Sequence, residues 1–166
     1  MNAFWDSLLG SMTVDPAVRT ASWKLARTPS ALRRARRVTR HKLACWGAAD
    51  QSDVVELLVS ELVANAMEHA RGTIRLTISM EDGLLRCEVE DDAPELPRMR
   101  QARLEDETGR GLQLVDMLSC CWGADHTAHG KVVWFEVPVP AAEPVAVEEP
   151  AATRRPAVAT LSAELS

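Results

Sequence analysis

Tyrosine is absent from this chain of 166 residues, and all aromatic side chains together make up only 4% of it. Hydrophobic residues nevertheless account for 46%, which is enough for one buried core. That core must therefore be built from leucine, valine, alanine and isoleucine, with tryptophan at a few places. The length suits one domain with a tail.

The chain also lacks an excess of basic residues and any long apolar run. Its net charge is -5 and its pI is about 5.4, which argues against a general nucleic-acid binder. No stretch approaches the roughly 20 apolar residues of a membrane span. Met1–Leu9 has neither the basic start nor the apolar run of a signal peptide. We therefore expect a soluble, cytoplasmic protein that contacts neither nucleic acid nor membrane.

Cysteine is scarce, and its spacing excludes the common zinc motifs. The four cysteines are Cys45, Cys87, Cys120 and Cys121. No two of them are separated by two residues, and no histidine lies at zinc-ligand spacing from them. Cys120 and Cys121 are adjacent, and neighbouring cysteines rarely form ordinary disulfides. We therefore expect reduced, buried thiols.

Hydrophobic periodicity divides the chain into three parts. Residues 1–18 are predicted to be a flexible leader, residues 19–137 the domain, and residues 138–166 a disordered tail rich in proline and alanine. Within the domain the signals predict the order β-α-α-β-β-loop-α-β-β. The predicted strands are Thr20–Arg27, Thr73–Met80, Leu84–Glu90, Trp122–Thr127 and Lys131–Val137, and the predicted helices are Ala31–Trp46, Asp53–His69 and Gly109–Leu118.

Three local features of these segments carry further predictions. Asp82-Gly83, between two alternating runs, predicts a tight β-hairpin. The first helix carries five arginines and a lysine. Such a run is most often a solvated face, and a docking surface for an acidic partner is the alternative. Ser52 or Asp53 is predicted to cap the second helix, with Glu56 as the capping-box residue.

The second helix places Glu61, Asn65 and His69 on one line, because their spacing is i, i+4, i+8. The line lies at the edge of the apolar face, whereas Glu56 and Ser60 are assigned to the opposite, solvent face. Polar groups beside a buried face need partners, which a ligand or a metal ion would supply. The alternative is an apolar face that polar residues merely happen to flank.

Two further positions suit ligand binding. Asp91 ends an alternating strand, where a carboxylate can accept a hydrogen bond from a ligand amine. Gly109-Arg110-Gly111 opens a helix, where unpaired N–H groups and a positive dipole end favour an anion. The segment is not a Walker A loop. It is not the dinucleotide fingerprint either, since Leu114 takes the place of the third glycine.

In this order, the motifs resemble those of the histidine-kinase-like (GHKL) ATPase superfamily, and most closely its branch of bacterial anti-sigma factor serine kinases. Ser60–His69 looks like the N box, and Asp91–Pro97 looks like the branch's version of the first glycine box. Glu107–Val115 looks like the second glycine box, and Gly130–Glu136 like the closing strand. The resemblance covers about residues 20 to 137.

The sequence departs from this family pattern in places. Ala93 stands where the branch often has serine. Val132 stands where many members have a threonine near the adenine site.

The resemblance implies an α+β fold, a two-layer α/β sandwich of the Bergerat type whose mixed sheet is covered on one face by helices. It implies ATP and Mg²⁺ as cofactors, with Asn65 as the metal ligand, Asp91 as acceptor for the adenine amino group and Glu61 as the catalytic base. The lid from Asp91 to Thr108, with its three arginines, would close over the phosphates. The implied nucleotide-contacting set is Asn65, His69, Asp91, Ala93, Gly109, Arg110, Gly111 and Leu112.

Three functions stay open from the sequence. The first is an anti-sigma factor and serine kinase that phosphorylates an anti-anti-sigma antagonist. The second is an ATP-binding module that sequesters a sigma factor or antagonist without phosphoryl transfer, and the third is a scaffold that binds no nucleotide. Members of the branch are often dimers, so a homodimer is among the expectations.

Overall fold

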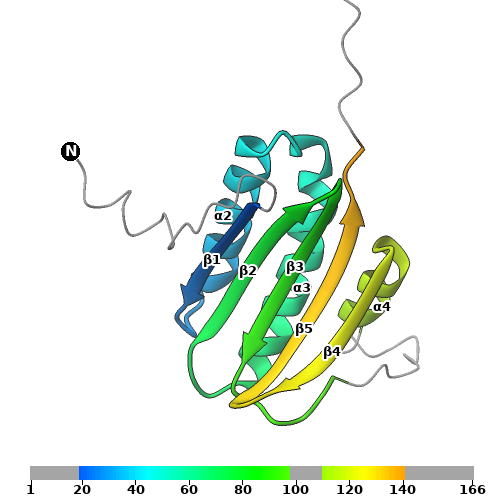
Figure 1. The fold of residues 1–166 in the computed structure, drawn as a ribbon. Helices are drawn as coiled ribbons and strands as arrows, with labels where there is room; N and C mark the ends of the chain where they lie inside the picture. The colour runs from blue at the N-terminus through cyan, green and yellow to red at the C-terminus, as the bar shows by residue number, and fades with distance from the viewer. Residues whose placement is uncertain (1–18, 98–109, 141–166) are drawn as a thin grey trace, which may run out of the picture.

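The structure is a computed structural model that describes residues 19–97 and 110–140 (Figure 1). Its elements follow the predicted order. The strands are β1 Arg19–Leu25, β2 Ile74–Glu81, β3 Leu84–Asp91, β4 Cys121–Thr127 and β5 Gly130–Pro138. The helices are α2 Ala31–Cys45, α3 Ser52–His69 and α4 Arg110–Leu118, with the 3-10 turn η1 Ala49–Gln51 before α3. No helix in these two described ranges is long and apolar enough to cross a membrane.

The domain boundaries can be compared with the prediction only in part. The predicted leader and most of the predicted tail lie outside the described residues. At the carboxyl end, β5 continues to Pro138. The Val139 N–H then donates a hydrogen bond of 2.7 Å to the Gly83 carbonyl. Ordered structure therefore continues slightly past the predicted end of the domain at residue 137.

The five strands form one sheet in the order β1-β2-β3-β5-β4, and the helices cover one of its faces (Figure 1). The two-layer α+β prediction is confirmed. The prediction of a mixed sheet is wrong, because all four strand pairs are antiparallel. The reason lies in the connections. Tight turns join β2 to β3 and β4 to β5, and the pair α2–α3 returns the chain to the sheet end that β1 left.

The core lies between the sheet and the helices and is almost entirely aliphatic, as the composition predicts. Alternate strand residues face the helices because side chains alternate across a strand. The buried strand residues include Ala21, Trp23, Leu25, Ile74, Leu76, Ile78, Leu85, Cys87, Val89, Val133, Phe135 and Val137. They pack against the buried side of α3, made by Val55, Leu58, Val59, Leu62 and Val63.

Two turns have the backbone geometry that their residue types favour, and the first is the predicted hairpin. Asp82 and Gly83 both have positive φ, 49° and 74°, as a two-residue hairpin loop with the twist of its strands requires. Gly47 has φ 75° and follows the end of α2, where the left-handed conformation favours glycine.

The basic run of α2 is only partly a solvated face. Arg40 donates from Nε and Nη2 to the two Glu56 carboxylate oxygens at 2.8 and 2.7 Å. Arg36 Nε donates to Ser60 Oγ at 2.7 Å. Glu56 and Ser60 are therefore buried against α2, and their assignment to the solvent face of α3 is wrong. Arg33 and Arg37 stay exposed.

The predicted cap of α3 is also wrong. Gln51 takes the cap position, and no side chain makes a capping hydrogen bond there. The turn η1 leads directly into α3, so the chain enters the helix already coiled. Glu56 is drawn away from the helix start by Arg40, because a bidentate charged pair is stronger than a single hydrogen bond to a backbone N–H.

Candidate functional site

The line of polar residues on α3 lies between its exposed side and the core. Glu61 and Asn65 are half-buried, whereas His69, the last residue of the helix, is exposed. At 1.5 Å per residue the line is about 12 Å long. The structure thus keeps the predicted edge position for Glu61 and Asn65 and leaves His69 at the open end.

Glu61 lies against the first turn of α4. A Cβ atom added to Gly111 would come within 2.7 Å of Glu61 Oε2 and 3.3 Å of Glu61 Cβ. A side chain at position 111 would therefore displace the Glu61 carboxylate from the start of α4. The fold therefore brings the predicted catalytic base into contact with the predicted phosphate-binding segment, although 50 positions separate Glu61 from Gly111 in the sequence.

The start of α4 offers backbone N–H groups that the helix does not use. Arg110 is its first residue, and Leu112 is partly buried against the hydrophobic core. Gly109 and the lid arginines Arg98, Arg100 and Arg103 lie outside the described residues, and so does the side chain of Arg110. The structure thus describes only the part of the predicted phosphate-binding segment that belongs to the start of α4.

At the end of β3, Asp91 is buried among polar partners. Its Oδ1 accepts a hydrogen bond of 2.8 Å from the Ala93 N–H. The same oxygen forms an ion pair with Lys131 Nζ at 3.1 Å. Both charged side chains are almost fully inaccessible, with 2% of Asp91 and 1% of Lys131 exposed. Ala93 is buried as well. The predicted adenine acceptor is thus oriented by two protein donors.

Asp92, the neighbouring carboxylate, has a different role. Its Oδ1 accepts a hydrogen bond of 2.8 Å from the Arg71 N–H. Backbone hydrogen bonds from Arg71 and Gly72 lower the pKa of Asp92 below its ordinary value. Asp92 is exposed and fixes the loop after α3 to the end of β3, so that only Asp91 faces the interior.

Lys131 was missed by the sequence interpretation, which assigned the position near adenine to Val132. In the structure Asp91 is the cross-strand partner of Lys131, whereas Val132 pairs with Glu90. Strand alternation could have revealed this. Val133 is a core residue, so Lys131, two positions earlier, must lie on the same face and Val132 on the other.

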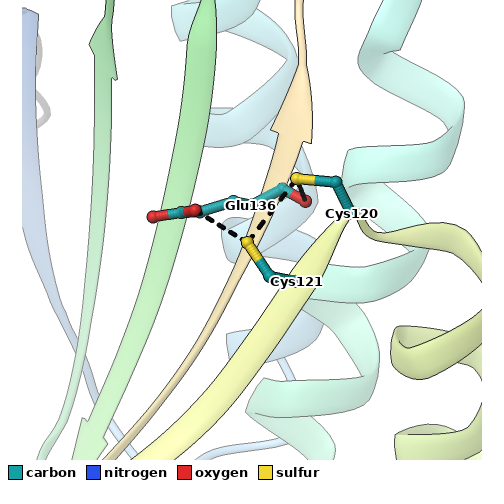
Figure 2. A group of neighbouring side chains, drawn as sticks. All are labelled: Cys120, Cys121 and Glu136. Atoms are coloured by element: carbon teal, nitrogen blue, oxygen red, sulfur yellow. Dashed lines mark hydrogen bonds between the residues drawn. The ribbon is translucent and has the colours of Figure 1, made fainter.

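The expectation of buried thiols is correct only for Cys87, whose pKa is raised by burial. Cys45, Cys120 and Cys121 are exposed. The Cys121 thiol donates a hydrogen bond of 2.9 Å to Glu136 Oε2 (Figure 2). This hydrogen bond, followed by the one with Cys120, raises the pKa of Cys121 to about 12. The same bond lowers the pKa of Glu136.

Thiol alkylation should reveal this difference. At about pH 8 we expect Cys121 to react with iodoacetamide at least about tenfold more slowly than Cys45, because a raised pKa keeps the thiol protonated and only the thiolate reacts. Glu136→Gln removes the carboxylate that stabilises the thiol form and should speed the alkylation of Cys121. Timed labelling followed by peptide mass spectrometry measures each rate. Equal rates for Cys45 and Cys121 in the unaltered protein would contradict the assigned hydrogen bond.

Comparison with known proteins gives one family and two relatives. Residues 25–137 match the histidine kinase-like ATPase domain. Over 71 residues the chain is 39% identical to the sensor protein kinase CarS of Pseudomonas aeruginosa, a match that spans 42% of this chain and 15% of that protein. The histidine kinase domain of the blue-light activated histidine kinase from Erythrobacter litoralis EL346 is 23% identical, with a TM-score of 0.44. That match covers 65% of this chain and 60% of the other.

The chain spans less than two thirds of both relatives, so these matches concern the domain and not the whole proteins. The family match, in contrast, runs from the last residue of β1 into β5 and includes every described element that positions Glu61, Asn65 and Asp91. The chain therefore belongs to the histidine kinase-like ATPase domain family, a family of ATP-binding domains.

Proposed function

We propose that this protein is an anti-sigma factor with serine kinase activity, which transfers phosphate from ATP to a serine of an anti-anti-sigma antagonist protein. The observation that carries the proposal is the contact between Glu61 and Gly111. It puts a carboxylate beside the helix start that suits the terminal phosphates. A base at this place can accept the proton of a serine hydroxyl that attacks the γ-phosphate.

The described residues fit ATP along α3. Asp91 would bind adenine at one end, and the start of α4 would bind the phosphates beside Glu61, with Asn65 between them. Asp91 Oδ1 already accepts from Ala93 and Lys131, so we assign Oδ2 to the adenine amino group. The backbone N–H groups of the first turn of α4 suit phosphate oxygens.

Asn65 would hold Mg²⁺ through its side-chain oxygen, since this ion takes oxygen ligands. When bound, the ion neutralises the charge that develops on the phosphates. The protein residues have the remaining tasks. Glu61 orients the incoming hydroxyl and takes its proton, and the helix start keeps the γ-phosphate in line with it. Such positioning and charge stabilisation account for most of the rate of phosphoryl transfer.

A second function, ATP-dependent sequestration without phosphoryl transfer, is favoured by a different observation. Arg33 and Arg37 remain exposed on α2, although other basic residues of this helix are tied to α3. An exposed basic helix face can dock an acidic partner protein. In this function ATP would order the domain for the partner, and Glu61 would be dispensable.

Phosphoryl transfer distinguishes the two functions. The purified protein is incubated with γ-labelled ATP, Mg²⁺ and candidate antagonist proteins, and the label on the antagonist is measured. Glu61→Gln keeps the size of the side chain but removes the base. We expect it to reduce transfer by about 10²–10⁴-fold and to leave ATP affinity nearly unchanged.

Glu68→Gln is the matched control, because Glu68 is an exposed carboxylate on the same helix and should be silent. The linkage of the product is a further readout, since phosphoserine survives acid whereas phosphohistidine does not. Acid-labile product would assign histidine kinase chemistry instead. Partner binding that needs ATP but is equal in Glu61→Gln, with no transfer in either protein, would favour sequestration.

A further inference from the structure

Cys120, Cys121 and Glu136 form a cluster of side chains on the sheet face away from the helices (Figure 2). Cys121 begins β4 and is the cross-strand partner of Glu136 in β5. Glu136 lies between the buried residues Phe135 and Val137, so its side chain points to the helix-free face. The two sulfur atoms and a carboxylate oxygen of Glu136 lie within 4.8 Å of one another.

The spacing of these atoms is that of ligands sharing one small cation. Two thiolates at about 2.3 Å from a tetrahedral zinc ion hold their sulfurs about 3.8 Å apart. The observed distance between Cys120 Sγ and Cys121 Sγ is 3.6 Å. The Cys121 Sγ to Glu136 Oε2 distance of 2.9 Å would need to lengthen by only about 0.6 Å when a zinc ion replaces the thiol proton.

A disulfide between Cys120 and Cys121 is less compatible with their geometry than a shared metal ion. An ordinary disulfide joins residues whose Cα atoms are about 4.4–6.8 Å apart. Adjacent residues across a trans peptide are only about 3.8 Å apart. The sulfurs can therefore share a metal ion where they stand, whereas bonding them directly would distort the peptide between them.

The carboxylate of the cluster is held in place by neighbours. Glu136 Oε1 accepts a hydrogen bond of 2.8 Å from Arg86 Nη1, while Oε2 turns to Cys121. The Arg86 guanidinium lies 3.9 Å from the centroid of the Trp134 ring. Outer partners that fix the orientation of a ligand are typical of built metal sites. Arg86 gives Glu136 such a partner before any ion binds.

We propose that Cys120, Cys121 and Glu136 bind one thiophilic divalent cation of the zinc class. Two sulfur ligands exclude magnesium and calcium, which prefer oxygen ligands alone. Three protein ligands leave a fourth position for water. Because Cys120 lies two residues after the end of α4 and directly before β4, the ion would tie the junction between α4 and β4 to β5. It is separate from the Mg²⁺ assigned to Asn65.

Cobalt titration tests this proposal on the full chain, kept reduced with a phosphine. Co²⁺ bound to thiolates absorbs in the near ultraviolet. We expect this absorption to saturate at one equivalent, to vanish when Zn²⁺ is added, and to be lost in the double variant Cys120→Ser/Cys121→Ser. Glu136→Gln should weaken binding at least about tenfold, because the neutral amide replaces an anionic ligand.

Cys45→Ser is the matched control, since Cys45 is an exposed cysteine with a potential ligand of its own, His41 Nε2, at 3.7 Å. It should leave the cobalt spectrum unchanged. Circular dichroism confirms that each variant is folded. The proposal is overturned if the folded protein shows no thiolate absorption in a large excess of Co²⁺. It is also overturned if the double variant keeps the absorption, or if Cys45→Ser removes it.

Discussion

Asp91→Ala is expected to lower the free energy of unfolding by about 3–5 kcal/mol, because it leaves the buried charge of Lys131 without a partner. This loss of stability is separate from any change in ATP affinity. The ammonium of Lys131 is 3.1 Å from Asp91 Oδ1, and 1% of its side chain is exposed. Chemical denaturation of the variant measures the loss. A stability equal to that of the unaltered protein would mean that Lys131 finds another partner or reaches solvent.

The double variant Asp91→Ala/Lys131→Met should regain most of this stability, because replacing both partners of a buried ion pair with apolar groups is often neutral. Because this double variant is folded, any change in its ATP affinity can be assigned to the loss of the Asp91 carboxylate. We expect ATP binding to weaken by about 10–100-fold, the usual worth of a hydrogen bond to a charged group. Calorimetric titration with ATP and Mg²⁺ gives the affinity.

Asp92→Asn is the matched control for this titration, because Asp92 fixes the neighbouring loop and faces solvent. It should bind ATP as the unaltered protein does. If the folded double variant also binds ATP with unchanged affinity, Asp91 is not the adenine acceptor. Without the double variant, a single Asp91→Ala experiment would confuse an unfolded domain with an empty nucleotide site.

The element order and the core could be predicted from the sequence because both depend on local patterns. The Asp82-Gly83 turn can be recognised from two consecutive residues. The strands on either side of it can be recognised from the alternation of apolar and polar residues along each strand. The contact of Glu61 with Gly111 was within reach through the resemblance, which places both motifs at one site. Each of these signals needs only the residue types and their spacing along the chain.

Contacts between distant segments were the part that local patterns could not supply. Arg40 reaches Glu56 only because α2 crosses α3, and this turned an expected cap into an ion pair. Glu136 meets Cys121 only through the register of β4 and β5, so spacing rules for zinc ligands had no way to find the cluster. Register also decides that Lys131, rather than Val132, is the cross-strand partner of Asp91.

Gly130→Ala is the substitution expected to disturb this register most. A Cβ atom at Gly130 would overlap the Asp91 carbonyl oxygen and lie 2.6 Å from Asp92 Cα. Both are backbone atoms that cannot rotate away, so β5 would have to move from β3 where Lys131 meets Asp91. We expect a loss of about 1–3 kcal/mol in the free energy of unfolding, the usual cost of overpacking, together with weaker ATP binding.

Gly111→Ala is the matched glycine control, because the nearest atom to its new Cβ is the flexible end of Glu61. In α4 the change from glycine to alanine should even contribute about 0.5–1 kcal/mol of helix stability. Denaturation in urea compares the two variants. A less stable Gly130→Ala, beside a Gly111→Ala that is at least as stable as the unaltered protein, would identify Gly130 as the glycine that closes the sheet. A fall in phosphoryl transfer by Gly111→Ala, as Glu61 is displaced, would identify Gly111 as the glycine that positions the base. If Gly111→Ala were instead the less stable variant, the backbone where β3 meets β5 would be able to shift to accommodate a Cβ atom. The contact between α3 and α4 would then be the one that cannot shift.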